Sequence, residues 1–511
     1  NSERRKRQKE LNIQVIIGNP PYSAGQSSQN ENNQNVKYEY LDKRIYETYT
    51  LSSANLLGKR SSLDSYIRAI RWASDRIKDQ GVVGFITNSG YLSSNAADGI
   101  RKCLIEEFSS LYIINLRGNS RTKGDIAKKE AGNIFDIRTP VAIAILVKNQ
   151  KAEMQGQLHY FDIGDYLSKK EKLEKISNLC SINGITSLKL WENITPDLHN
   201  DWLNHRDDSF QDFIKIHDKN SVSLFEKISL GVITNRDAWN YDFSLLKLQA
   251  RTKKALEFFN EEVIRYKKAC VGLTPDKYPN MMDFVRKDLS ITSWGGRSWK
   301  SPFKRHIEQS YNSADFQINL YRPFIKQFHY NSTVFNHSFY SMRKIFPELK
   351  SENLIISATG QGASTAFSVL ISNQVMDLEC ISKGQCFPLY LYEENCTENN
   401  DTDLFTQDND QTTDSRYTRK DAISENGLKH FENAYPTETI SKEDIFYYVY
   451  GLLHSEDYRT RYADNLTKEL PNIPCVKKAE DFWAFSKAGR DLAHWHLNYE
   501  TVEPYKAKLD L

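Results

Sequence analysis

At 511 residues the sequence is long enough for several domains, because a domain usually takes about 100 to 200 residues. Hydrophobic residues make up 39% and charged residues 26%, and no apolar run of about 18 residues occurs that could span a bilayer, so we predict no association with a membrane. The formal net charge of +2 is nearly neutral, so binding to nucleic acid would have to depend on local basic patches.

An apolar segment at residues 13–18 predicts a short buried β-strand, and the tetrapeptide Asn19-Pro20-Pro21-Tyr22 follows it directly. The prolines fix φ and remove two backbone donors, so the turn presents carbonyl oxygens and the Asn19 amide without competing N–H groups. An exocyclic NH2 group held by the Asn19 side-chain oxygen and the Pro20 carbonyl would direct its lone pair toward an electrophile. Tyr22 offers a ring face on which a planar base can stack. The pattern indicates amino-group methylation, with a purely structural turn as the alternative.

This strand and tetrapeptide resemble the catalytic motif of N6-adenine DNA methyltransferases, which take the methyl group from S-adenosylmethionine. The resemblance implies catalytic roles for Asn19, Pro20, Pro21 and Tyr22, with Tyr22 stacking on an adenine flipped out of the duplex. Protein glutamine methyltransferases use the same tetrapeptide, but they are compact and lack a large aromatic and basic C-terminal region. A methyltransferase that acts on a protein glutamine is therefore one alternative function.

The cofactor site of that family includes a glycine-rich turn upstream of the catalytic strand, and only a dozen residues precede Ile13 here. Downstream, Gly360-Gln361-Gly362 is the only closely spaced glycine pair after a strand-like run, and no matching acidic residue follows it. We therefore expect a fragment whose cofactor-binding half is missing, so that S-adenosylmethionine would bind mainly outside this chain.

Residues 23–60 are polar and rich in Ser, Gln and Asn, which indicates either a flexible surface loop or a loop that orders over nucleic acid or cofactor. Hydrophobic periodicity then predicts, in order, a helix at 65–77, a strand at 82–87, a helix at 99–108, and strands at 111–116 and 141–147. This order predicts an α/β fold that matches the C-terminal half of a Rossmann-like methyltransferase sheet, with an antiparallel pair at its end.

Phe135 lies in the loop before the last of these strands, where the resemblance places an aromatic residue that stacks on the opposite face of the flipped base. A core position is the alternative for this side chain. The preceding stretch at 117–129 is basic, and Arg121 and Lys123 are candidates for contacts with DNA phosphates. A solvated loop without such contacts remains open.

Composition changes after residue 150, and we predict three regions. A partial methyltransferase domain at 1–150 is followed by a helical connector at 151–190, in which residues 169–175 form a helix of mixed charge. A mixed α+β target-recognition domain follows at 191–511. The stretch at 395–424, rich in Asn, Asp, Thr and Gln, indicates an insertion.

Arginines and aromatic residues are interleaved in this last region, which suits a nucleic-acid surface. Arg236, Arg297 and Arg322 are the candidates for contacts with DNA, and packing is the alternative for each of them. For Arg322 that alternative is an ion pair with a core carboxylate.

Five segments of the region are similar to the methyltransferase and target-recognition part of single-chain type ISP restriction-modification enzymes: 231–239, 321–324, 386–392, 447–459 and 481–483. In that family a nuclease, an ATP-driven helicase-like translocase and the cofactor-binding half precede this part on one polypeptide. The resemblance implies double-stranded DNA as a partner, those upstream segments as missing partners, and site-specific adenine-N6 methylation as the function. A DNA-binding specificity module without catalysis is the second alternative.

Seven cysteines are scattered along the chain without any Cys-x-x-Cys pair, which argues against a zinc module or a disulfide framework. We therefore predict no metal site and a cytoplasmic location.

Overall fold

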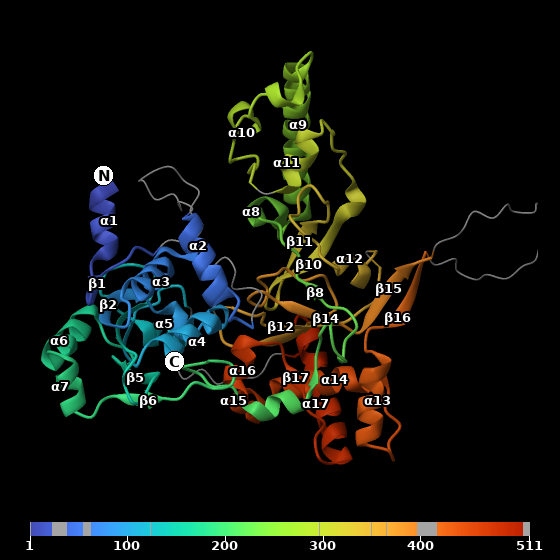
Figure 1. Cartoon of the computed structure of the whole chain (residues 1–511). Coiled ribbons are helices and arrows are strands. Elements are labelled where there is room, and N and C mark those ends of the chain that lie inside the picture. Colours follow the sequence, from blue (N-terminus) through green and yellow to red (C-terminus); the bar gives the residue numbers. More distant parts are fainter. Residues whose placement is uncertain are drawn as a thin grey trace, which may run out of the picture. The chain divides into compact units, whose positions relative to one another are not determined.

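The computed structural model describes residues 2–22, 38–54, 63–122, 124–295, 297–348, 350–363, 365–395 and 416–503 (Figure 1). It consists of two compact units, Asn1–Asp207 and Asp208–Leu511. Lys123, the centre of the polar loop predicted at 23–60, and most of the insertion predicted at 395–424 lie outside the described residues. For Arg297 only the backbone is described.

The first unit is built on a six-stranded mixed sheet with the order β1-β2-β4-β3-β5-β6. Strand β1 pairs parallel with β2, β4 lies antiparallel between β2 and β3, and β5 runs parallel to β3. This topology confirms the predicted α/β fold with an antiparallel pair. The strands are β1 (Val15–Gly18), β2 (Gln80–Asn88), β3 (Ser110–Arg117), β4 (Val141–Asn149), β5 (Gln157–Asp162) and β6 (Glu192–Ile194).

The longer helices α3 and α4 of this unit each bury one face in its core. In α3, for example, Tyr66, Ile67, Ile70 and Ala73 recur at helical spacing and all join the core of this unit. The helices predicted at 65–77 and 99–108 are confirmed. The set comprises α1 (Ser2–Glu10), α2 (Glu39–Ile45), the π-helix η1 (Tyr46–Thr50), α3 (Ser65–Arg76), η4 (Ser89–Leu92), η5 (Asn95–Ala97), α4 (Asp98–Glu107), α5 (Gly124–Glu130), α6 (Lys169–Leu179) and α7 (Ile182–Ser187).

Strand β1 differs from the prediction of a buried strand. It lies at the edge of the sheet, where β2 is its neighbour, and Val15 and Ile17 are 59% and 83% exposed. Only the alternate side chains, including Ile16, pack on the core. An apolar run of this length cannot distinguish a central strand from an edge strand, because both are rich in Val and Ile.

The boundary between the two units lies after Asp207, whereas the sequence placed a domain end at 150 and a connector at 151–190. The reason is that β5 extends the sheet beside β3, and β6 pairs with β5. A buried ion pair between Arg101 and Asp201, 2.7 Å long, also fastens the end of this unit to α4. The mixed-charge helix predicted inside the connector is present as α6.

The second unit contains small antiparallel sheets and helices, which confirms the predicted mixed α+β class. One sheet has the order β13-β12-β14-β8 and another the order β10-β11-β9. Its strands are β7 (Ile214–Lys215), β8 (Ser229–Leu230), β9 (Tyr241–Asp242), β10 (Phe316–Arg322), β11 (Ile325–Tyr330), β12 (Ile355–Ala358), β13 (Val369–Ser372), β14 (Gln385–Pro388), β15 (Tyr390–Glu394), β16 (Tyr417–Asp421) and β17 (Asn472–Ile473).

Helices α14 and α17 pack closely against each other in this unit, and glycine makes the approach possible. A Cβ atom at Gly451 would lie 2.3 Å from the Phe485 carbonyl oxygen, and one at Gly489 would lie 1.9 Å from the Tyr447 carbonyl oxygen. The helices are α8 (Asp237–Asn240), α9 (Leu245–Cys270), α10 (Met281–Phe284), α11 (Arg297–Lys304), α12 (Met342–Ile345), α13 (Glu425–Ala434), α14 (Lys442–His454), α15 (Glu456–Arg461), α16 (Ala463–Lys468) and α17 (Ala479–Leu497), with short 3₁₀ turns at Asp208–Asp212, Pro275–Lys277 and Ser313–Asp315.

Candidate functional site

One edge of the first unit's sheet gathers several of the predicted site residues. Strands β1, β2, β3 and β5 run in the same direction, so their carboxyl ends lie at this edge, and antiparallel β4 begins there. Asn19–Tyr22 follows β1, Arg121 follows β3, and Phe135 lies in the loop that leads into β4. Strands β1 and β4 are two strands apart, which is a sideways distance of about 10 Å, and Gly18 at the end of β1 lies level with Ala144 of β4. Ligands of open α/β sheets bind at this edge.

The Asn19–Tyr22 turn exposes its asparagine and anchors its tyrosine. The Tyr22 hydroxyl donates to Asn19 Oδ1 over 3.3 Å, and the Tyr22 ring packs edge-on against Tyr66 at a centroid distance of 6.2 Å. Partial burial raises the pKa of Tyr22 to about 12, so the hydroxyl stays a donor at neutral pH. Asn19 Oδ1 keeps a second lone pair, and its side chain is open to solvent.

Phe135 is 42% exposed and belongs to a loop that a single side chain organises. Asn133 Oδ1 accepts from the backbone N–H of Phe135 over 2.9 Å and of Ile137 over 3.3 Å. Asn133 Nδ2 donates to the carbonyls of Gly118 and Thr139 over 2.9 and 2.8 Å. The Asn133 amide therefore joins the loop after β3 to the loop before β4 and leaves Phe135 and Ile137 facing solvent.

Backbone conformation at two positions makes this arrangement possible. Gly118 has φ +91, and a Cβ atom there would lie 2.9 Å from both Cα and Nδ2 of Asn133. Asp136 has φ +57, which Asp tolerates better than most residues, and its carboxylate pairs with Lys169 on α6. Sequence reasoning missed Asn133, although Asn commonly accepts from the N–H two residues ahead in a turn.

The end of β3 and the basic loop after it carry one ion-paired and one exposed arginine. Arg117 pairs with Asp162 over 2.7 Å and with Asp165, so it stabilises the end of the sheet. Arg121 is exposed, and its backbone N–H is fixed by Asn119 Oδ1 at 3.1 Å. Arg121 therefore remains a candidate for contact with phosphate beside Phe135.

Arg236 in the second unit is buried, which corrects its interpretation as a residue that faces DNA. Its side chain is only 1% exposed, and the guanidinium donates to Ser293 O over 3.1 Å, to Ser298 Oγ over 2.7 Å and to Gly295 O. It also lies over the Trp299 ring at 5.3 Å. Burial lowers the pKa of Arg236 to about 10. An arginine enclosed in this way cannot reach a base unless the segment at 293–298 opens.

Arg322 adopts the packing alternative. Its guanidinium contacts Asp377 at 2.8 Å and Asp237 at 3.4 Å, and it lies 3.8 Å from the centre of the Tyr321 ring. Burial raises the pKa of Asp377 to about 6, against the opposing effect of the Arg322 charge. The contacts of Arg322 are therefore those expected of a residue that packs within the unit. The third candidate, Arg297, has a side chain that the structure does not describe.

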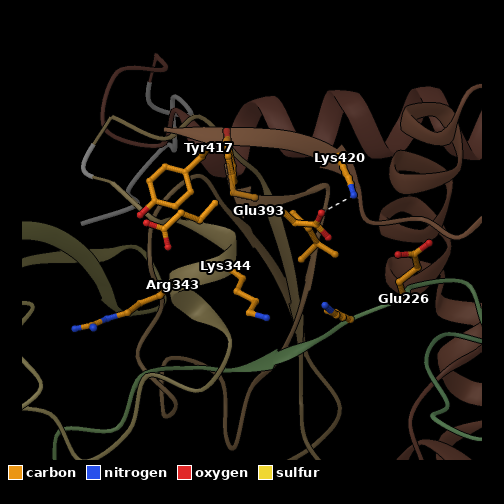
Figure 2. A pocket seen from close by; sticks show the side chains of 10 residues that line it. Glu226, Arg343, Lys344, Glu393, Tyr417 and Lys420 are labelled. Atoms are coloured by element: carbon orange, nitrogen blue, oxygen red, sulfur yellow. Dashed lines mark hydrogen bonds and ion pairs between the residues drawn. The ribbon is translucent and has the colours of Figure 1, made fainter. Parts of the chain in front are cut away.

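A pocket of about 500 Å³ lies beside the β15–β16 hairpin and contains none of the predicted site residues (Figure 2). Both acidic and basic side chains line it, and Lys420 pairs with Glu393 in its wall. Figure 2 shows Lys344 and Arg343 on the side opposite this pair. The mixture of charges gives no preference for one ligand.

The glycine pair at 360–362 does not fit a cofactor turn. It lies in the loop between β12 and β13 of the second unit, and no helix follows it before β13. A Cβ at Gly360 would lie 2.2 Å from Lys383 O, and Lys383 Nζ donates to Gly362 O over 2.6 Å. Lys383 is therefore packed against both glycines of this turn. The part of the chain that is described also contains no cluster of metal ligands and no helix long and apolar enough to cross a membrane.

Comparison with known families connects both units to one class of protein. The family model described as the Type ISP C-terminal specificity domain matches residues 223–510, which is more than half of the chain. The chain belongs to the Type ISP family of restriction-modification enzymes. A second model, the Eco57I restriction-modification methylase, matches residues 3–121, which contain Asn19–Tyr22.

Three solved structures, two of them of Type ISP restriction-modification enzymes, resemble the chain over nearly its whole length. LlaGI, solved as a nuclease-deletion mutant with a DNA substrate mimic, is 38% identical with a TM-score of 0.80, and the match covers 99% of this chain and 44% of LlaGI. The ATP-dependent enzyme LlaBIII, bound to DNA, is 36% identical with a TM-score of 0.78. This match covers 98% of this chain and 31% of LlaBIII. The DrdV protein, solved as a complex with DNA, is 32% identical with a TM-score of 0.78. This match covers 99% of this chain and 46% of DrdV. The chain spans less than half the length of each of these proteins.

Proposed function

We propose that the chain is the catalytic and target-recognition portion of a restriction-modification enzyme that methylates adenine N6 in double-stranded DNA. The first unit holds the flipped base and the second unit selects the site. The single observation that carries the proposal is the Asn19–Tyr22 turn at the carboxyl edge of the sheet, within the segment similar to a restriction-modification methylase.

The chemistry assigned to this turn is orientation of the amine. Asn19 Oδ1 has one lone pair engaged by Tyr22, and its second lone pair is free to accept a hydrogen from the adenine NH2 group. The Pro20 carbonyl accepts the other hydrogen. Tyr22 and Phe135 offer rings for the two faces of the base, which offsets part of the stacking lost on extrusion. Arg121 contacts the phosphate backbone beside the extruded nucleotide.

The methyl donor of the complete enzyme is S-adenosylmethionine in this proposal. The described residues lack a glycine-rich turn that fits it, so the donor binds mainly to parts of the polypeptide outside this chain. The longer LlaGI, LlaBIII and DrdV chains leave room for such parts, and for nuclease and translocase segments. The specificity-domain match favours DNA over a protein glutamine as the substrate.

The first prediction concerns Asn19→Ala in the complete enzyme. We expect loss of methyl transfer with nearly unchanged duplex affinity, because the variant removes an acceptor for the flipped base while phosphate contacts carry most of the affinity. Sequencing of modified bases in cells that express the enzyme, together with duplex binding in vitro, measures both. Asn12→Ala, an exposed asparagine before β1 at the opposite edge, is the control. Equal loss of transfer and binding would identify Asn19 as a structural turn residue.

A further inference from the structure

A helical arm in the second unit, residues 245–311, concentrates positive charge. It includes the long helix α9 together with α10 and α11, which lie beside α9 in Figure 1. The arm contains 14 Lys and Arg against 7 Asp and Glu, a net charge of +7, whereas the whole chain has +2. The rest of the chain is therefore net negative, so the arm is a region of net positive charge in a chain that is otherwise net acidic.

Helix α9 divides into a buried face and a lysine face. Its buried side chains, among them Phe259, Val263 and Tyr266, form a core with Trp294 and Trp299 that is separate from the main core of the unit. At 3.6 residues per turn, the exposed lysines fall on the opposite half of the helix: Lys247, Lys253, Lys254, Lys267 and Lys268. The five lysines extend from Lys247 to Lys268, or about 32 Å along the helix.

These five lysines form no ion pair with any carboxylate that the structure describes. Two acidic residues share their half of the helix, and Glu261 is engaged by Arg286 at 2.7 Å. Glu257 is the other one. The lysine face therefore carries a surplus of positive charge, with five lysines against Glu257 and Glu261.

The arm is also held rigidly at its base. The buried Arg236 guanidinium, which lies outside the arm, binds Ser293 O and Ser298 Oγ and stacks on Trp299. At the start of α9, Arg251 pairs with Asp242 at 3.0 Å and donates to Tyr241 O at 2.9 Å. The lysines consequently belong to a helix whose first turns are tied to strand β9.

We propose that the lysine face of α9 binds the phosphate backbone of the DNA duplex and supplies sequence-independent affinity. The inference rests on the proposed function and extends it to a surface outside the predicted arginines. DNA is the occupant that fits, because it carries a negative charge about every 1.7 Å along its axis, so lysines at both ends of a span of about 32 Å each lie within reach of phosphates. Lysines act here as flexible point charges that position the duplex and read no base.

The test is the salt dependence of duplex binding by the 511-residue chain and by Lys247→Gln/Lys254→Gln/Lys268→Gln. The probe is a fluorescently labelled duplex of random sequence, titrated between about 50 and 200 mM salt. We expect the slope of log K against log salt to decrease by about 0.9 for each lysine on a phosphate, or about 2.7 for three. Thermal unfolding of both proteins checks that the variant is folded.

The matched control removes the same charge elsewhere in the unit, with Lys429→Gln/Lys477→Gln/Lys478→Gln, all at exposed positions. A full slope in the control together with a reduced slope in the α9 variant supports the proposal. Equal reduction in both would show that only total charge matters and would overturn it, as would an unchanged slope in a folded α9 variant. Absence of duplex binding by the unaltered chain would instead contradict the proposed function itself.

Discussion

Asn133 shows how one amide can set the position of two neighbouring side chains. Its oxygen fixes the backbone of Phe135 and Ile137, and its nitrogen fixes the carbonyls of Gly118 and Thr139. All four groups belong to loops, which have no strand partner to satisfy them. Gly118 is required because any side chain there would collide with Asn133. Asn133 is therefore a positioning residue for the aromatic ring proposed to stack on the base.

We predict that Asn133→Ala in the complete enzyme lowers kcat for methyl transfer more than it raises KM. The variant removes four hydrogen bonds, each worth about 1 kcal/mol, and releases Phe135 from its fixed position. Asn133→Asp keeps the oxygen that accepts from Phe135 and Ile137, but its second carboxylate oxygen would face the Gly118 and Thr139 carbonyls, so it should not restore the rate. Steady-state kinetics on duplex DNA measures the effect. A rise in KM with an unchanged kcat would mean that the loop serves binding and not base positioning.

Arg322 and Asp377 form an ion pair, and breaking it should lower the stability of the second unit. We predict that Arg322→Ala destabilises the second unit by about 2 to 3 kcal/mol, since it leaves a buried carboxylate unpaired while Arg322 is itself partly exposed. Urea unfolding measures this, and Arg322→Ala/Asp377→Asn should recover part of the loss. Arg305→Ala, at an exposed position of the arm, is the control. Weakened DNA binding at unchanged stability would instead make Arg322 a residue that contacts DNA.

At the scale of elements, strand β11 carries a buried histidine that connects it to α8. His329 Nε2 lies 3.0 Å from Asn240 Nδ2 and 2.7 Å from Asn336 Oδ1, and all three side chains are buried. Burial lowers the pKa of His329 to about 4, well below its ordinary value of 6.5. The neutral ring is therefore the form that the folded state accepts.

The sign of the pH effect follows from this shift. Because the folded pKa lies below the unfolded one, the stabilisation from neutral His329 is complete above pH 6.5 and is lost as the pH falls toward 4. We predict that the free energy of unfolding decreases by about 2 kcal/mol more between pH 7 and 5 in the unaltered chain than in His329→Gln. Urea titrations at both pH values measure the difference. Parallel curves for the two proteins would mean that His329 titrates normally.

The regular elements of the first unit could be predicted because their patterns are long. Helix α3 alternates core and surface residues over three turns, and β4 is apolar over seven residues. The surroundings of single side chains were harder to predict from the sequence. An arginine beside aromatic residues has the same sequence pattern whether it contacts DNA or donates to carbonyls inside the protein, as Arg236 does. Asn133 could not be found, since its partners at 118 and 139 are brought together only by the pairing of β3 with β4.

At the scale of the whole molecule, the chain joins two units with separate cores. The clusters around Ile113 and Leu116 belong to the first unit, and those around Phe387 and Phe259 belong to the second. The methylase match lies in the first unit and the specificity-domain match in the second. The proposed catalytic and recognition roles therefore correspond to bodies that could vary independently, because neither core shares residues with the other.

The last prediction concerns the methyl donor, and it tests whether the cofactor site of the complete enzyme lies within this chain or outside it. The described residues contain one closely spaced glycine pair after a strand, and Lys383 is packed against Gly360 and Gly362. We therefore predict that calorimetric titration of the isolated chain with S-adenosylmethionine shows no saturable binding at micromolar concentration, while the complete enzyme, as the control, shows it. If the isolated chain binds the donor tightly, its cofactor site lies within these residues, and the carboxyl edge beside Asn19 is the first place to look for it.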